Sequence, residues 1–147
     1  MMITTKGRYG TRFLLDLALN SSDRAVSLRD VAKRQGISDK YLEQIVPLLS
    51  RAGFIRSVRG AQGGYMLIHK PEDINLGDVL KALEGTLAPL DCVDPESECK
   101  CDRVEECVTT EVWKKIYDAV SAVVDSITFA DLVNEYKKKT GQFDYYL

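Results

Sequence analysis

The spacing of apolar residues near the amino terminus predicts a helix as the first large element. Tyr9, Phe13 and Leu17 recur at four-residue intervals, so they share one face of a helix over residues 7–20. Ahead of this helix, residues 2–5 are expected to form a short β arm.

Two capped helices separated by a glycine follow. Ser27 precedes an apolar pattern over residues 28–35, and Ser38 precedes another over residues 39–51, each in the position of an N-cap. Gly36 lies between them, where a left-handed residue ends a helix. Two helices joined by such a turn are typical of a helix-turn-helix, whose second helix enters the major groove of DNA.

A glycine-rich hairpin comes next. Residues 54–59 and 65–69 are strand candidates on either side of a glycine-rich tip. A helix-turn-helix followed by such a hairpin predicts a winged helix. A further helix begins at Asn75 and ends at Gly85.

The carboxyl-terminal half contains a long amphipathic helix at residues 110–126. Thr128 and Asp131 then form a capping-box pattern for a last helix that runs to about residue 139. Little chain remains to cover the long helix, so we expect its apolar face to be buried against a second copy. That face comprises Trp113, Ile116, Val120, Val123, Val124 and Ile127.

The predicted fold is therefore mainly α, with a small β-hairpin wing and a long dimerisation helix. We divide it into a winged helix-turn-helix DNA-binding domain at residues 1–85, a cysteine-rich loop at 86–109, and a dimerisation helix with a carboxyl-terminal segment at 110–147. The aromatic tail at residues 142–147 has no assigned role.

Charge is distributed unevenly between the two halves of the chain. Residues 1–70 hold 12 Lys and Arg against 5 Asp and Glu, whereas residues 71–147 hold 8 against 17. A basic first half joined to an acidic second half suggests a polyanion-binding head. Chance drift of solvated charge is the alternative.

All four cysteines lie in one acidic, polar stretch, with the spacing C-x6-C-x-C-x5-C. Too few apolar residues surround them to order the loop, and thiolates are ligands for iron–sulphur clusters and for zinc. Structural zinc sites usually show paired C-x2–4-C spacings, so the wider gaps here favour a cluster. Zinc and a ligand-free thiol switch stay open as alternatives.

The compartment and the class of protein follow from what the sequence lacks. No apolar run approaches the length of a membrane span, and the first residues lack the apolar stretch of a secretory signal. We therefore expect a cytoplasmic protein with no membrane partner, in which thiols stay reduced. With one histidine, no catalytic triad set and no phosphate-binding loop motif, the sequence does not predict an enzyme.

Three short motifs resemble the Rrf2 superfamily of bacterial winged-helix regulators. They are TKGRYG at residues 5–10, YLEQ at 41–44 and RGAQGGY at 59–65. The cysteines ahead of a Trp-containing helix and SITFADL at 126–132 are similar to the branch around the iron–sulphur cluster regulator IscR. The resemblance implies a homodimer that binds palindromic, double-stranded operator DNA.

The same resemblance implies a 2Fe–2S cluster held by three cysteines and one other ligand. By position these cysteines are Cys92, Cys101 and Cys107. Thr110 stands where IscR supplies a histidine, and threonine is a poor iron ligand. Cys99 is therefore one candidate for the fourth ligand, and a residue of the other subunit's amino-terminal arm is another.

Candidate DNA contacts lie at the start of the second helix of the motif and along the wing. Glu43 resembles a residue that accepts from a cytosine amino group, and Arg59 is placed for a narrow minor groove. Each basic residue has solvated charge as its alternative interpretation. The candidates are Arg8, Ser38, Lys40, Tyr41, Glu43, Gln44, Arg51, Arg56, Arg59, Gly60 and Gln62, with Arg34 as a further phosphate contact.

The resulting hypothesis is a transcription regulator of the repressor class that senses iron–sulphur status and controls cluster-assembly genes, with the direction of its regulation left open. Two rivals use the same fold. One resembles the cysteine-metabolism repressor CymR, which acts through a protein partner without a cluster. The other is a nitric-oxide or redox sensor that uses the same cluster.

Overall fold

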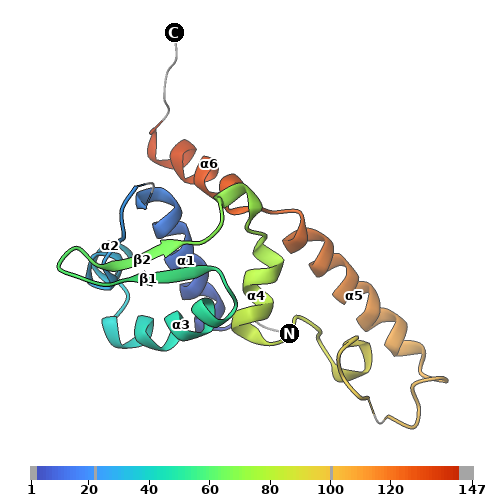
Figure 1. Cartoon of the computed structure of the whole chain (residues 1–147). Helices are drawn as coiled ribbons and strands as arrows, with labels where there is room; N and C mark the ends of the chain where they lie inside the picture. Colours follow the sequence, from blue (N-terminus) through green and yellow to red (C-terminus); the bar gives the residue numbers. More distant parts are fainter. Residues whose placement is uncertain (1–2, 22, 100, 143–147) are drawn as a thin grey trace.

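The computed structural model describes residues 3–21, 23–99 and 101–142. Figure 1 shows a compact head from which one long helix projects. The helices are α1 (Thr5–Asn20), α2 (Leu28–Gln35), α3 (Asp39–Arg51), α4 (Leu76–Glu84), α5 (Val108–Asp125) and α6 (Phe129–Thr140). The strands are β1 (Ile55–Val58) and β2 (Gly64–Leu67), and short 3-10 turns span Pro71–Asp73 and Asp91–Val93.

The helix-turn-helix forms as its local sequence predicts. The Ser27 hydroxyl accepts from the Asp30 amide at 3.1 Å, and the Ser38 hydroxyl accepts from the Tyr41 amide at 3.1 Å. Gly36 ends α2 with φ 65°, a left-handed conformation in which a side chain is disfavoured. The predicted helix-turn-helix is therefore confirmed.

The wing is a two-stranded antiparallel hairpin in which Ile55 pairs with Leu67. Val26, just before α2, adds an isolated bridge to Tyr65 and so ties the wing to the head. A Cβ on Gly64 would collide with the carbonyl of Val26, so this crossing requires glycine. The Tyr65 ring meets Phe13 of α1 edge to face, with centroids 6.1 Å apart.

The carboxyl-terminal helix α6 belongs to the same core. The Leu76 amide donates to the carbonyl of Ile127 at 2.9 Å, and the Phe129 amide donates to the carbonyl of Ile74 at 3.0 Å. Phe129 is fully buried within the core cluster. The predicted capping box of α6 is confirmed, because the Asp131 amide donates to the Thr128 hydroxyl and the Thr128 amide donates to the Asp131 carboxylate. The division at residue 110 stays a prediction. The helix α6 packs on α1, and α5 packs on α4.

The long helix α5 leaves the head and carries the cysteine loop at its far end (Figure 1). None of its residues is buried. The predicted apolar face is divided: Trp113, Val120 and Val124 are half-buried, whereas Ile116 and Val123 are 40% and 59% exposed. Within the described chain, no helix is long and apolar enough to cross a membrane.

Two expectations about the chain ends need comment. The β arm predicted at residues 2–5 is wrong for its described part, because α1 begins at Thr5 and no strand is assigned to residues 3 and 4. The aromatic tail from residue 143 onward lies outside the described residues.

Candidate DNA-binding surface and cysteine loop

The first turns of α3 present a polar surface to solvent. Lys40, Glu43 and Gln44 are exposed, because Leu42 and Ile45 turn inward and hold the helix to the core. Ser38 uses its hydroxyl oxygen as the helix cap. The structure therefore brings these candidate base-reading residues together on one exposed face.

Tyr41 is held by α1 instead of standing free. Its ring meets Tyr9 edge to face, with centroids 5.3 Å apart. The guanidinium of Arg8 lies 5.8 Å from the centre of the Tyr9 ring, and that of Arg12 lies 5.5 Å from it. Such cation–π contacts place positive charge beside the start of α3. Arg12 was missed from the sequence, because its position in α1 alone does not show that it lies over the Tyr9 ring, which in turn packs on Tyr41.

Arg34 has a different position from the other candidate phosphate contacts. Its guanidinium binds the buried Asp16 carboxylate at 2.7 and 3.0 Å. The hydrogen bond to Asp16 raises the pKa of Arg34 above its ordinary value. Gln35 also donates to Asp16, at 3.0 Å. This group joins α1 to α2, so a structural role accounts for Arg34.

The wing extends the candidate surface. Arg59, Gly60 and Gln62 are exposed at the hairpin tip. Arg56 is exposed on β1 with its guanidinium 3.5 Å from the sulphur of Met66, and Arg51 donates to the carbonyl of Pro47 at 3.3 Å. Neither contact neutralises the charge, so both guanidinium groups can still meet phosphate.

The cysteine loop surrounds an open hollow of about 500 Å³. Cys92, Cys99 and Cys101 line it, together with Leu90, Asp91 and Glu98. A smaller hollow of about 310 Å³ lies between Cys92 and α5, and its lining includes Thr110 and Lys114. The structure thus brings three of the predicted thiols, Cys92, Cys99 and Cys101, to the lining of one hollow. Cys107 does not line this hollow.

Cys107 stands directly before the first residue of α5. Its sulphur lies 3.1 Å from the hydroxyl oxygen of Thr109. Hydrogen bonds from Thr109 first, and then from Thr110, lower the pKa of Cys107 to about 7. A thiol with this pKa is readily deprotonated at neutral pH, which is the state in which sulphur binds metal.

The hollow fits an iron–sulphur cluster in the chemistry of its donors, since thiolates are the usual ligands. It is not preassembled: among the described residues, no group of three or more His, Cys, Asp or Glu side chains is arranged to hold a metal ion. All four cysteines are free thiols: Cys92 and Cys107 are half-buried, and Cys99 and Cys101 are exposed. Binding would therefore require the loop to close around the ligand.

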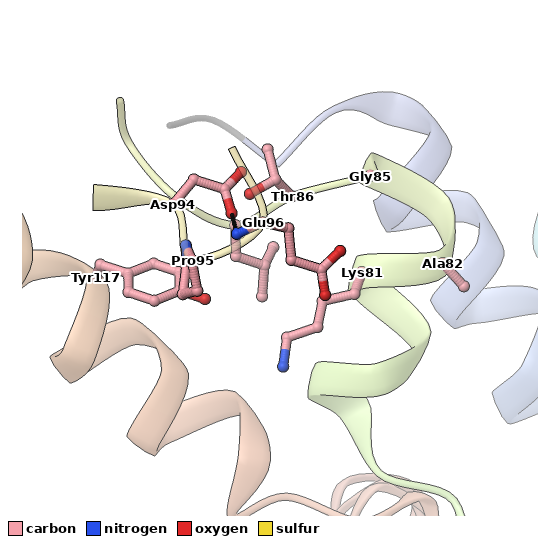
Figure 2. A pocket seen from close by; sticks show the side chains of 9 residues that line it. Lys81, Ala82, Gly85, Thr86, Asp94, Pro95, Glu96 and Tyr117 are labelled. Atoms are coloured by element: carbon pink, nitrogen blue, oxygen red, sulfur yellow. Dashed lines mark hydrogen bonds between the residues drawn. The ribbon is translucent and has the colours of Figure 1, made fainter. Parts of the chain in front are cut away.

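A third hollow, of about 390 Å³, connects the loop to the head. Figure 2 shows Lys81, Gly85 and Thr86 from the end of α4 facing Asp94, Pro95 and Glu96 of the loop, with Tyr117 of α5 alongside. Within the loop, the Glu96 amide donates to the Asp94 carboxylate at 3.0 Å. The loop and the end of α4 therefore lie on opposite sides of one hollow.

Comparison with known proteins adds a family to this geometry. Residues 3–135 match the family described as "Rrf2: Iron-dependent Transcriptional regulator". The chain is 47% identical over 135 residues to Protein rrf2 of Nitratidesulfovibrio vulgaris, covering 92% of this chain and 89% of that protein.

Two solved structures share the fold across nearly all of the chain. T. potens IscR matches with a TM-score of 0.77 and 38% identity, covering 99% of this chain and 94% of that one. CymR, described as the global cysteine regulator of B. subtilis, matches with a TM-score of 0.75 and 37% identity, covering 92% of this chain and 98% of that one.

Proposed function

The chain belongs to the Rrf2 family of winged-helix transcriptional regulators, and from this premise we propose that it is a homodimeric DNA-binding regulator that senses iron–sulphur status. In this proposal α3 and the wing bind operator DNA, and the cysteine loop holds a 2Fe–2S cluster. Genes of cluster assembly are the proposed targets. The single observation that carries the sensing part is the gathering of Cys92, Cys99 and Cys101 around one open hollow.

The DNA-binding part is supported by the exposed face of α3 and the wing. Lys40, Glu43 and Gln44 can reach base edges, where Gln pairs with adenine and an acid accepts from cytosine. Arg59 at the wing tip suits a narrow minor groove. Arg8, Arg51 and Arg56 are exposed and are the candidate phosphate contacts, each adding about 0.9 to the salt slope of binding.

The dimer is supported by the outward face of α5. Val112, Ile116 and Val123 are 48%, 40% and 59% exposed, and they follow one another at helical spacing. Contiguous apolar surface that is exposed to water marks an interaction site. Here it is most simply covered by the same face of α5 in a second subunit.

For the cluster, we propose Cys92, Cys101 and Cys107 as ligands, with Cys99 or a group of the second subunit as the fourth. When bound, a 2Fe–2S cluster supplies a redox-sensitive and oxidant-sensitive charge. The chain supplies the thiolates, and Cys107 is prepared by its lowered pKa. Loop closure would then shift the population of DNA-binding states, because the two states make different contacts.

One second candidate has an observation in its favour. CymR is as similar in fold as IscR, and the described thiols form no ready metal site. A CymR-like regulator would act through a protein partner without a cluster. A nitric-oxide or redox sensor would use the same cluster, and comparison of operator release by nitric oxide, peroxide and iron chelation separates it from an iron–sulphur sensor.

Anaerobic reconstitution tests the sensing proposal. Wild-type protein should gain about two iron and two sulphide per subunit, the content that defines this cluster type. The Cys92→Ala variant should lose the visible absorbance. Cys99→Ala, in the same hollow, should lose it as well if Cys99 is the fourth ligand and keep it if that ligand comes from the second subunit. Wild-type protein that takes up neither iron nor sulphide overturns the proposal, and colourless protein that retains a stoichiometric partner favours the CymR-like function.

A further inference from the structure

The amino terminus of α1 is capped by a residue from far along the chain. Thr4 occupies the N-cap position, but its side chain makes no capping bond, and the first turn of α1 contains no acidic residue. The Glu84 carboxylate instead accepts from the Thr4 amide at 2.9 Å, the Gly7 amide at 3.0 Å and the Thr4 hydroxyl at 2.8 and 2.9 Å. Charge at this end also complements the helix dipole.

The crossing of α1 and α4 leaves little room for movement at this contact. A Cβ on Gly7 would collide with the Glu84 carboxylate, and a Cβ on Gly10 would collide with the Leu83 side chain. Both glycines are buried. The last turn of α4 and the first turns of α1 therefore form one closely packed unit.

The same segment of α1 also contacts the first turn of α3. Arg8 lies over the Tyr9 ring, and Tyr9 packs edge to face on Tyr41 in the first turn of α3. The position of Glu84 is thus connected, through contacts between neighbouring groups, to the position of two candidate DNA contacts.

The cysteine loop meets the unit formed by α1 and α4 directly after Glu84. Gly85 and Thr86 share the 390 Å³ hollow with Asp94 and Pro95 of the loop (Figure 2). Asp94 and Pro95 also line the hollow that contains Cys92. The loop therefore borders the same hollow as the residues that directly follow Glu84.

We propose that Glu84 is a positioning residue for DNA binding, which sets Arg8 and Tyr41 against DNA. The inference rests on the proposed DNA-binding function and deepens it by naming a residue that acts on the DNA-binding surface through α1. Removing the carboxylate releases the first turn of α1, so Arg8 loses its fixed position and contributes less to binding.

The test measures binding to a duplex that the wild-type protein selects from a random-sequence pool, over a salt titration. Glu84→Gln should bind about five- to tenfold more weakly, within the range found for residues that couple sites without touching the ligand. Glu72→Gln is the control, because Glu72 is exposed and its substitution removes the same charge as Glu84→Gln does. Loss of a negative charge alone favours a polyanion, so Glu72→Gln should bind as tightly as wild type or more tightly.

A double-mutant cycle separates positioning from simple stabilisation of the fold. Arg8→Ala should weaken wild-type binding but have less than a twofold effect in the Glu84→Gln background. Thr4→Val, which removes only the hydroxyl bonds, is the milder variant if Glu84→Gln unfolds, and it should bind about twofold more weakly. Additive effects of Arg8 and Glu84, or unchanged binding by both Glu84→Gln and Thr4→Val, overturn the inference. Failure of wild-type protein to select any duplex overturns the proposed function itself.

Discussion

The head and the projecting arm of this molecule differ in what holds them in place. In the head, Phe13, Leu17, Leu42, Val79 and Phe129 are all fully buried. In the arm, meaning the cysteine loop and α5, the helix has no buried residue and Val108 is 82% exposed. The head therefore has its own core, whereas the arm leaves apolar surface and thiols uncovered.

The difference teaches where regulation can act. A segment with few buried contacts opens at low free-energy cost, and binding elements are drawn from such segments. The arm is joined to the head at its two ends, where the loop follows α4 and where residues 74–76 meet 127–129, and between these joints its helix has no buried residue. Its order then depends on what it binds, while the DNA-binding surface stands on a core that is already formed.

The largest expected effect is on the core of the head. Phe129→Ala should lower the free energy of unfolding by about 3–5 kcal/mol, because it leaves a cavity where a fully buried ring stood. Val108→Ala, on the most exposed apolar residue of α5, should change stability by less than about 0.5 kcal/mol. Chemical denaturation of both variants gives the comparison, and equal losses would mean that the head and the arm do not differ as described.

Local features of the head could be predicted from sequence, and distant contacts could not. Ser27, Ser38 and Gly36 act on backbone groups within a few residues, so their roles follow from spacing. The contact between Glu84 and Thr4 joins residues 80 positions apart, and no local pattern contains it. The same reason explains why Arg34, which looks like a free cation in the sequence, turns out to bind Asp16.

The arm was predictable in its elements but not in its orientation. Helical periodicity places Ile116 and Val124 on one broad apolar face. Only the tertiary structure shows that Val124 is half-buried while Ile116 is exposed to solvent. Likewise, the spacing of the cysteines indicates a ligand-binding loop, but loop conformation decides that Cys99 joins Cys92 and Cys101 at the hollow.

The second prediction concerns the outward face of α5. Ile116→Glu puts a charge on a surface proposed to be desolvated in the dimer, so it should raise the dimer dissociation constant at least about 100-fold. Lys114→Gln changes net charge by the same amount on the face toward the cysteine loop, and should leave association unchanged. Sedimentation equilibrium measures both. A dimer of unchanged affinity in Ile116→Glu, with the helical content of wild type, would show that α5 is covered by something else.

The smallest expected effect is in the reactivity of Cys107, a thiol at the start of α5 whose pKa is strongly lowered. Because the pKa of Cys107 is lowered to about 7, about half of this thiol is ionised at pH 7, whereas an ordinary cysteine with a pKa near 8.5 is only a few per cent ionised. In metal-free protein, iodoacetamide should therefore modify Cys107 several-fold to about tenfold faster than the exposed Cys99 at pH 7.

The rate at Cys107 should rise with pH through a midpoint near 7, since the thiolate is lost as pH falls below the pKa. Thr109→Val removes the hydroxyl that contributes most to this shift, and should move the midpoint upward. Peptide mapping by mass spectrometry follows each thiol separately. A midpoint near 8.5 for Cys107 in the wild-type chain would mean that the start of α5 does not hold the thiolate, and that the arm offers no prepared ligand before it binds.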